Sequence, residues 1–298
     1  MINSDITKAM VENSASIKYM KGLEFQDLGV TPAAMEEAVN QLRELIMGET
    51  LLECPTDDAF LLKFLRGRKF DVQRAFKNVK KYFEVRRDNP EMFGALGLHG
   101  VPFDVACRVH RLVAVSRKTD PEGRGVIMYK IGSWRPDICS LNDIFRIALL
   151  YSEHLLLREE FQTKGIVALL DLEHLSPYHL VHYTPSVIRT FITLAQDVLP
   201  QRIKGVYVVN NPAIFDIFFS IAKTFMKSKL IQRTRLFGYN WEELHKLVPV
   251  DVIPEEHGGT LESYDYDLVK EELIAEDGYF QKINSYGYRT ATEESTHL

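Results

Sequence analysis

The residues of this sequence that could do covalent or metal chemistry gather in the segment DLEHLSPYHLVHY, residues 171–183. Asp171, Glu173, His174, His179 and His182 are of types that transfer protons or bind metals. His179 and His182 could share one face of a helix, but the SPYH turn separates them from His174, and neither spacing matches a known metal-ligand set. The two acids could equally cap a helix or lie in a loop. A hydrolase or metalloenzyme built on this segment is therefore the weakest of three functional hypotheses.

Other signs of covalent chemistry are missing from the sequence. It contains no G-x-G-x-x-G, no P-loop, no G-x-S-x-G elbow and no H-E-x-x-H. The three cysteines, Cys54, Cys107 and Cys139, are widely spaced and form no C-x-x-C, which argues against disulfides and zinc and favours a reducing compartment. We expect a protein that is not an enzyme and that holds neither a metal nor a cofactor.

An apolar helix followed by basic residues, PAIFDIFFSIAKTFMKSKLIQRTRLF at 212–237, is the most informative stretch. On a helical wheel its apolar arc is about twice the width of roughly 100° that a surface helix needs. Between Ile217 and Trp241 there is no acidic residue but there are five basic ones, although the whole chain has a net charge of −5. The stretch is either a core helix with a solvated basic edge, or a lid over a lipid pocket that also contacts an anionic membrane.

Length and composition describe a globular protein. The 298 residues are enough for two domains, and 46% hydrophobic with 26% charged residues is an ordinary balance. A slightly acidic chain is not expected to bind nucleic acid in bulk. The N-terminus lacks the apolar stretch of a secretory signal, and no run approaches the roughly 18 apolar residues of a membrane span. We expect a cytoplasmic monomer that associates reversibly with membranes, endosomal ones included.

The first third of the sequence has helical periodicity. Thr31 and Pro32 are typical of a helix start, a second helix should begin after Asp57 and Asp58, and a third should span 72–87. Seven basic side chains of this bundle are expected to form a solvated face: Arg66, Arg68, Lys69, Arg74, Lys77, Lys80 and Lys81. We predict a flexible N-terminal segment at 1–30 and an all-α domain at 31–95.

After residue 100 the pattern becomes that of an α/β domain, predicted at 100–260. Strands are expected at 112–115, 126–131, 165–172 and 206–209, the first two paired as a hairpin, with helices at 141–157 and 185–198. This alternation predicts a mostly parallel sheet with flanking helices. A last strand is expected at 229–236, and the acidic, Tyr-rich tail at 261–298 should be a short helix with a frayed end.

Several of these segments together resemble a known family. They are DAFLLKFLRGRKFDVQRAF, VSRKTDPEGRGVIMYKIGSW, TPSVIRTF, LPQRIKGVYVVNNPAIFDIFFSIAKTF and VIPEEHGG. In order and spacing, from about residue 31 to 259, they resemble the CRAL-TRIO family, in the branch of tocopherol- and retinaldehyde-binding proteins. The resemblance implies a helical N-terminal domain, then a lipid-binding domain whose cavity is closed by a mobile gate helix at about 212–226.

The resemblance also implies site residues. Hydrophobic pocket positions would be Phe145, Leu149, Ser152, Ile166, Leu170, Ile188, Phe191, Ile192, Ala195, Phe215, Phe218, Phe219, Ile221, Ala222 and Phe225. A basic cleft beside the gate would bind phosphoinositide phosphates through Arg202, Lys204, Lys229 and Arg233, whose charges suit such groups. Of two serines near the ligand head in that branch, one is Ala148 here and the other is kept as Ser152, so the ligand itself is open. Tyr151 and Tyr183 could supply replacement hydroxyls.

The leading hypothesis is a cytosolic carrier of one small hydrophobic lipid, tocopherol-, retinoid- or other isoprenoid-like. It would exchange this lipid with phosphoinositide-containing membranes. The alternative is a phosphoinositide-binding adaptor in membrane trafficking that transfers no lipid.

Overall fold

The computed structural model describes residues 28–94 and 96–289. Its N-terminal part is helical, with α2 (Pro32–Met47), α3 (Asp58–Gly67), α4 (Val72–Asp88) and α5 (Pro90–Phe93). The predicted starts are confirmed, because the side chains of Thr31 and Asp57 accept hydrogen bonds from the backbone N–H groups of Ala34 and Phe60 at 3.2 and 3.1 Å. The predicted flexible segment at 1–30 lies almost entirely outside the described residues, and the predicted domain boundaries stay predictions.

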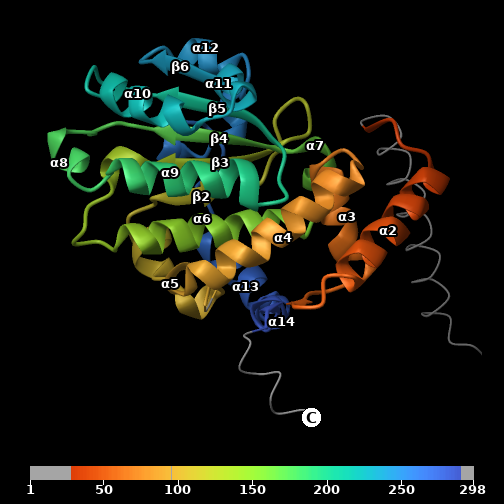
Figure 1. Ribbon diagram of the computed structural model, residues 1–298. Helices are drawn as coiled ribbons and strands as arrows, with labels where there is room; N and C mark the ends of the chain where they lie inside the picture. Colours follow the sequence, from red (N-terminus) through yellow and green to blue (C-terminus); the bar gives the residue numbers. More distant parts are fainter. Residues whose placement is uncertain (1–27, 95, 290–298) are drawn as a thin grey trace, which may run out of the picture.

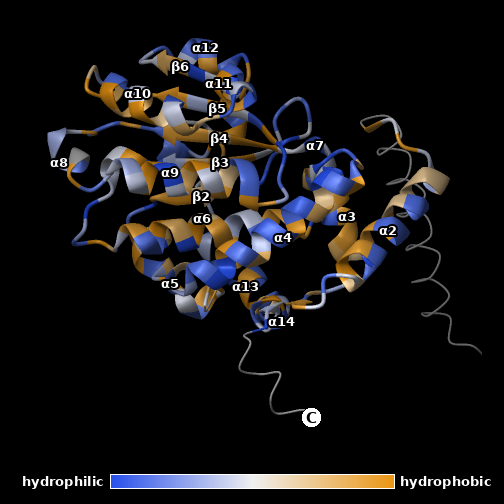
Figure 2. Cartoon of the chain, in the orientation of Figure 1, coloured by the Kyte–Doolittle hydropathy of each residue, from blue (hydrophilic) through white to orange (hydrophobic). Residues whose placement is uncertain are grey.

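A five-stranded sheet in the order β2-β3-β4-β5-β6 forms the centre of the second part (Figure 1). The strands are β2 (Val113–Val115), β3 (Gly125–Lys130), β4 (Ile166–Asp171), β5 (Ile203–Val209) and β6 (Thr234–Gly238). The expected hairpin is confirmed, since β2 and β3 pair antiparallel, and every other pair is parallel. In Figure 2 hydrophobic residues are concentrated along β4 and β5, as is typical of a parallel sheet covered by helices.

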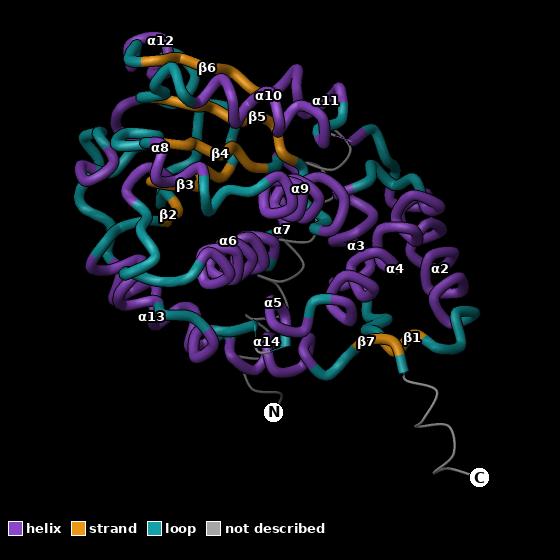
Figure 3. The backbone as a smooth tube through the Cα atoms, turned by 60° about the vertical axis from the view of Figure 1, so that its left-hand side comes forward, coloured by secondary structure: helices purple, strands orange, loops and turns teal. Residues whose placement is uncertain are grey.

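Helices cover this sheet and connect its strands. The connections contain α6 (Leu141–Leu156), α7 (Glu159–Lys164), α8 (Pro177–Leu180), α9 (Pro185–Thr193), α10 (Phe215–Phe225) and α11 (Ser228–Arg233), and α12 (Trp241–His245) follows the last strand. A wide π-helical turn, η4 (Leu194–Val198), follows α9 directly. In Figures 1 and 3, α6 and α9 run between the sheet and the N-terminal helices α3 and α4. The fold class expected from the sequence is therefore confirmed.

A two-residue strand and several short 3-10 and π-helical turns are the other elements that precede residue 266. They are β1 (Leu52–Glu53), η1 (Leu98–Gly100), η2 (Asp104–Val109), η3 (Ile131–Ser133), η5 (Val250–Val252) and η6 (Glu255–His257). Among the described helices none is both long and apolar enough to cross a membrane.

The last predicted strand is wrong in its first half. Residues 228–233 form α11, and β6 begins only at Thr234. Lys, Leu, Gln and Arg in this stretch are good helix formers. The helix places Leu230 in the wall of a cavity. In a strand, successive side chains of this stretch would instead point to opposite faces of the sheet.

The C-terminal segment differs from the expected short helix. It forms α13 (Tyr266–Ala275), α14 (Asp277–Asn284) and β7 (Gly287–Tyr288), which pairs with β1 near the N-terminal helices. Leu273, Phe280 and Ile283 are almost completely buried, so hydrophobic packing holds this segment against the body of the protein. The predicted frayed end at 290–298 lies outside the described residues.

A buried cluster of charged and phenolic groups joins four helices from both parts of the chain. Lys63 of α3 donates to Glu153 of α6 at 3.0 Å and to the Tyr279 hydroxyl of α14 at 2.8 Å. Glu153 also accepts from the Tyr82 hydroxyl of α4 at 2.8 Å. Burial by itself raises the pKa of Glu153, but the Lys63 charge and hydrogen bonds from Lys63 and Tyr82 outweigh it and lower the pKa below its usual value.

We predict that Glu153→Gln lowers the free energy of unfolding by about 3 to 5 kcal/mol, because it leaves Lys63 buried without a counter-charge. Urea unfolding measures the change. The matched control is Asp251→Asn, which removes the exposed partner of Lys118 and should leave the free energy of unfolding nearly unchanged, because water screens an exposed ion pair. Equal, small effects of both substitutions would show that the buried pair is not what holds the helices together.

Candidate functional site

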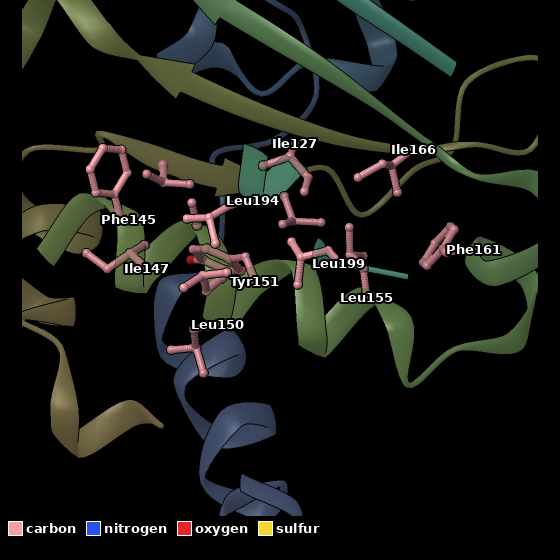
Figure 4. Close-up of a cluster of buried hydrophobic side chains, with 14 of the residues drawn as sticks. Ile127, Phe145, Ile147, Leu150, Tyr151, Leu155, Phe161, Ile166, Leu194 and Leu199 are labelled. Atoms are coloured by element: carbon pink, nitrogen blue, oxygen red, sulfur yellow. The ribbon is translucent and has the colours of Figure 1, made fainter. Parts of the chain in front are cut away.

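An apolar cavity of about 230 Å³ lies between the sheet and α6, α9 and α10. Alternate residues of the strands face it, as the twofold repeat of a β-strand requires: Ile166, Ala168 and Leu170 on β4, and Val206 and Val208 on β5. Figure 4 shows the hydrophobic packing beside it, where Ile127 and Ile166 come from the sheet and Phe145 and Ile147 from α6. The strands thus give one wall of the cavity and the helices the other.

Helix α10 covers the cavity with its apolar face. Phe215, Phe218, Phe219 and Ala222, at helical spacing, line the cavity. Phe218 is only 7% exposed and its ring meets the Tyr183 ring edge-on, with centroids 6.1 Å apart. Ile217, on the other face, is 54% exposed. The other exposed residues of α10 are Asp216, Ser220, Lys223 and Thr224, so the outer side of the helix is mainly polar, with Ile217 as its exposed apolar residue. The lid expected from the sequence stays a prediction.

The C-terminal end of α10 is attached to η4. The Gln196 amide donates to the Phe225 carbonyl at 3.0 Å and accepts from the Lys227 backbone N–H at 3.1 Å. The Lys227 ammonium forms an ion pair with Asp197. These contacts hold the end of α10 and the start of α11 against η4.

The structure brings most of the predicted pocket residues together. All line the cavity except Leu149, Ile221 and Phe225. Leu149 is packed in the main core. Ile221 follows Ile217 by one helical turn on the outer side, and the Phe225 ring lies 6.0 Å from the Arg189 guanidinium. Whether the lining residues bind a ligand stays a prediction.

Sequence reasoning missed several lining residues. The missed ones include Tyr129, Val206, Val208, Gln201, Leu230 and Thr234. The alternation along the predicted strands could have identified the valines. Of the two tyrosines considered as sources of hydroxyls, Tyr183 lines the cavity, whereas Tyr151 is fully buried in the core.

A second hollow, a cationic cleft of about 720 Å³, lies at the seam between the N-terminal helices and the sheet domain. Arg202, Lys204, Lys229 and Arg233, predicted from the sequence, all line it. So do six further cations: Arg68, Lys69, Arg74, Lys77, Lys81 and Lys227. Asp197 is the one carboxylate among the described residues that line it. The cleft is therefore strongly positive in a protein of net charge −5.

The positive field of the cleft shifts its own side chains. Burial lowers the pKa of Lys204, and the charges of Arg202 and Arg233 lower it further. The pKa of Lys229 is lowered by burial and then by Arg233 and Lys69. These ammonium groups are destabilised by their like-charged neighbours, so a polyanion in the cleft would relieve the repulsion.

The predicted solvated face of the N-terminal helices is wrong for Arg66, whereas Lys69, Arg74, Lys77 and Lys81 are exposed as expected. Arg66 is 3% exposed and donates to Gln162 at 2.6 Å and Glu159 at 3.3 Å, so it joins α3 to α7. Most of the other cations line the cleft, because α3 and α4 pack against the sheet domain instead of standing apart. Lys80 is not part of the cleft lining and pairs with Glu49 at 2.7 Å.

The cavity and the cleft share part of one wall. Ala195, Gln201, Ile203 and Leu230 line both hollows. An apolar compartment and an anion-attracting compartment are thus separated by a single layer of side chains, next to the attached end of α10.

The segment at 171–183 has structural roles. Asp171 accepts from the Glu173 backbone N–H and from the Asn210 amide, both at 2.9 Å. The buried His179 ring contacts the Trp134 carbonyl oxygen at 3.0 Å through Nε2. Within residues 28–94 and 96–289 there is no group of three or more histidine, cysteine or acidic side chains arranged to hold a metal.

Comparison with known proteins agrees with this architecture. Residues 33–81 match the model of the CRAL/TRIO N-terminal domain, and residues 110–259 match that of the CRAL/TRIO domain. The chain is 36% identical to the alpha-tocopherol transfer protein-like protein of Homo sapiens over 245 residues, 82% of this chain and 71% of that one. It is 32% identical to clavesin-1 of Xenopus laevis over 252 residues, 84% of this chain and 76% of that one.

Among solved structures, the crystal structure of Sfh5 is similar in fold. The two share 11% sequence identity with a TM-score of 0.56, over 83% of this chain and 99% of that one. From the two domain matches and relatives above 30% identity over most of both chains, this protein belongs to the CRAL/TRIO family.

Proposed function

We propose that this protein is a carrier that binds one small hydrophobic lipid under α10 and exchanges it with phosphoinositide-containing membranes. One observation carries the proposal: an apolar cavity and a cationic cleft share a wall beside the attached end of α10, whose apolar face covers the cavity. A lipid suits the first compartment and phosphate groups suit the second. The cargo class is tocopherol-, retinoid- or other isoprenoid-like, in keeping with the name of the alpha-tocopherol transfer protein-like relative.

The cavity supports reversible binding rather than covalent chemistry. Its wall is almost entirely hydrocarbon and aromatic, so affinity comes from removing apolar surface of the cargo from water, at about 25 cal/mol per Å². The carrier acts as a monomer, without a metal or cofactor, and catalyses no reaction. Release requires that α10 moves, because Phe218 and its neighbours otherwise cover the cargo.

The cleft supports docking on an anionic membrane surface. Each cation near such a surface contributes about 1 kcal/mol, so several together hold the protein loosely enough to leave again. Phosphates in the cleft would also compete with Asp197 for Lys227, which belongs both to the cleft and to the attachment of α10. Docking would therefore weaken the closed position of the helix at the membrane, where cargo is exchanged.

A second function, a phosphoinositide-binding adaptor without lipid transfer, is favoured by the relative size of the two hollows. The cleft, at about 720 Å³, is larger than the cavity, at about 230 Å³. Organic extraction of the purified protein followed by mass spectrometry separates the two functions. A carrier retains a stoichiometric hydrophobic lipid, or takes one up on incubation, whereas the adaptor does neither.

We predict that Phe218→Asp increases the dissociation rate of a fluorescent tocopherol or retinoid analogue at least about tenfold, because a carboxylate is costly in an apolar wall. Ile217→Asp, one residue away on the exposed face, is the matched control and should leave the rate nearly unchanged. Stopped-flow displacement measures both rates. Indistinguishable rates for the two variants would rule out α10 as the cover of the cargo.

We also predict that the double substitution Lys204→Gln and Lys229→Gln slows cargo transfer to phosphoinositide vesicles several-fold while equilibrium cargo binding is kept. These two lysines are chosen because Arg202 and Arg233 also donate to backbone carbonyls, of Thr163 and Ile203 respectively. Lys118→Gln with Lys246→Gln removes the same charge from exposed positions outside the cleft and is the control. Equal transfer rates for the two double variants would refute docking through the cleft.

A further inference from the structure

We propose that Gln201 determines which end group the cargo must carry, by selecting lipids with a free hydroxyl over the same lipids with that hydroxyl blocked. The proposal rests on the carrier function above and names the chemistry of its cargo. It assigns to Gln201 a direct hydrogen bond to the cargo at the wall between the cavity and the cleft.

The first observation is an unused hydrogen-bond acceptor. Gln201 is 8% exposed, and its amide nitrogen donates to the Ala195 carbonyl at 3.4 Å, a long contact. Its side-chain oxygen is buried and has no hydrogen-bond partner among the described residues. Buried polar atoms are nearly always paired, because losing water without gaining another partner is costly. A hydroxyl donor arriving with the cargo would supply the missing partner.

The second observation is the place of this residue in the fold. Gln201 lies just before β5 (Ile203–Val209), and it lines both the cavity and the cationic cleft. The terminal torsion of a glutamine side chain is soft, so its oxygen can turn toward a cargo hydroxyl without any change in the backbone. A hydroxyl held there would lie at the polar boundary of the cavity, and the hydrocarbon body would fill the apolar remainder.

The third observation is the scarcity of other polar groups around the cavity. The Thr234 hydroxyl already donates to the Leu230 carbonyl at 2.9 Å. Burial raises the pKa values of Tyr129 and Tyr183, so both phenols stay protonated at neutral pH. Ser152 is the remaining hydroxyl in the lining. Each of these hydroxyls can donate its own proton, whereas the Gln201 oxygen can only accept, so it alone requires a donor.

The experiment compares matched lipid pairs on matched variants of the full chain. The probes are α-tocopherol with its methyl ether, and retinol with its methyl ether, and fluorescence titration gives the dissociation constant of each. For the unchanged protein we expect the hydroxyl member of at least one pair to bind about 10- to 100-fold more tightly, the range for a buried hydrogen bond. In Gln201→Leu this ratio should fall to about one, with the affinity for the ether kept or increased.

Two control variants separate Gln201 from the neighbouring hydroxyls. Ser152→Ala and Tyr183→Phe each remove one hydroxyl from the lining and should leave the hydroxyl-to-ether ratio within about twofold of the unchanged protein. Binding of the ether shows that each variant is folded and has a working cavity. Loss of the ratio in Ser152→Ala or Tyr183→Phe instead of Gln201→Leu would assign selection to that hydroxyl and overturn the proposal.

The remaining outcomes are also decisive. Tight binding of both members of each pair with no preference in the unchanged protein would overturn the role of Gln201 and leave the carrier function standing. The unchanged protein could also bind neither pair after any retained lipid has been removed. That result would overturn the proposed carrier function for tocopherol- or retinoid-like cargo, and this inference with it.

Discussion

The buried pair of Lys63 and Glu153 fixes the relation between the two halves of the chain, and the rest of the site depends on that relation. Glu153 belongs to α6, the helix that also gives Phe145 and Ser152 to the cavity, whereas Lys63 belongs to α3. A close backbone approach continues this contact, since a Cβ atom at Gly67 would lie 2.4 Å from the Pro200 carbonyl oxygen. The cationic cleft exists only because the N-terminal helices are held this close to the sheet domain.

The cleft collects charge from segments far apart in the sequence, which explains how an acidic protein can attract a polyanion. Lys69 and Lys77 come from the N-terminal helical part, whereas Lys204 lies in β5 and Lys229 in α11. Burial, and then the neighbouring positive charges, lower the pKa values of Lys204 and Lys229, so holding these charged groups in the cleft has an energetic cost. A bound anion would reduce the repulsion among these cations. The positive field of the cleft therefore favours anion binding, although it does not stabilise the free protein.

Much of the architecture could be predicted from the sequence, because it depends on residue patterns within single helices and strands. The capping residues Thr31 and Asp57, the alternation in β4 and the apolar face of α10 can each be recognised within a few residues. Tertiary contacts could not be predicted in this way. The sequence around Arg66 is that of an exposed arginine, and only the folded structure places Gln162 and Glu159 beside it. The unpaired side-chain oxygen of Gln201 could not be predicted from the sequence either, because it depends on the absence of a hydrogen-bond donor nearby in the folded structure.

The two ends of α10 are secured unequally. Its C-terminal end is tied to η4 through Gln196 and through the ion pair of Lys227, whereas in the described structure no side chain caps the N-terminal end at Ile214. A rigid rod tethered at one end moves as a lever about that tether, and its displacement grows with distance from it. Before docking, any displacement of α10 would therefore be largest beside Phe215, and loss of the ion pair between Lys227 and Asp197 on docking would loosen the second end as well.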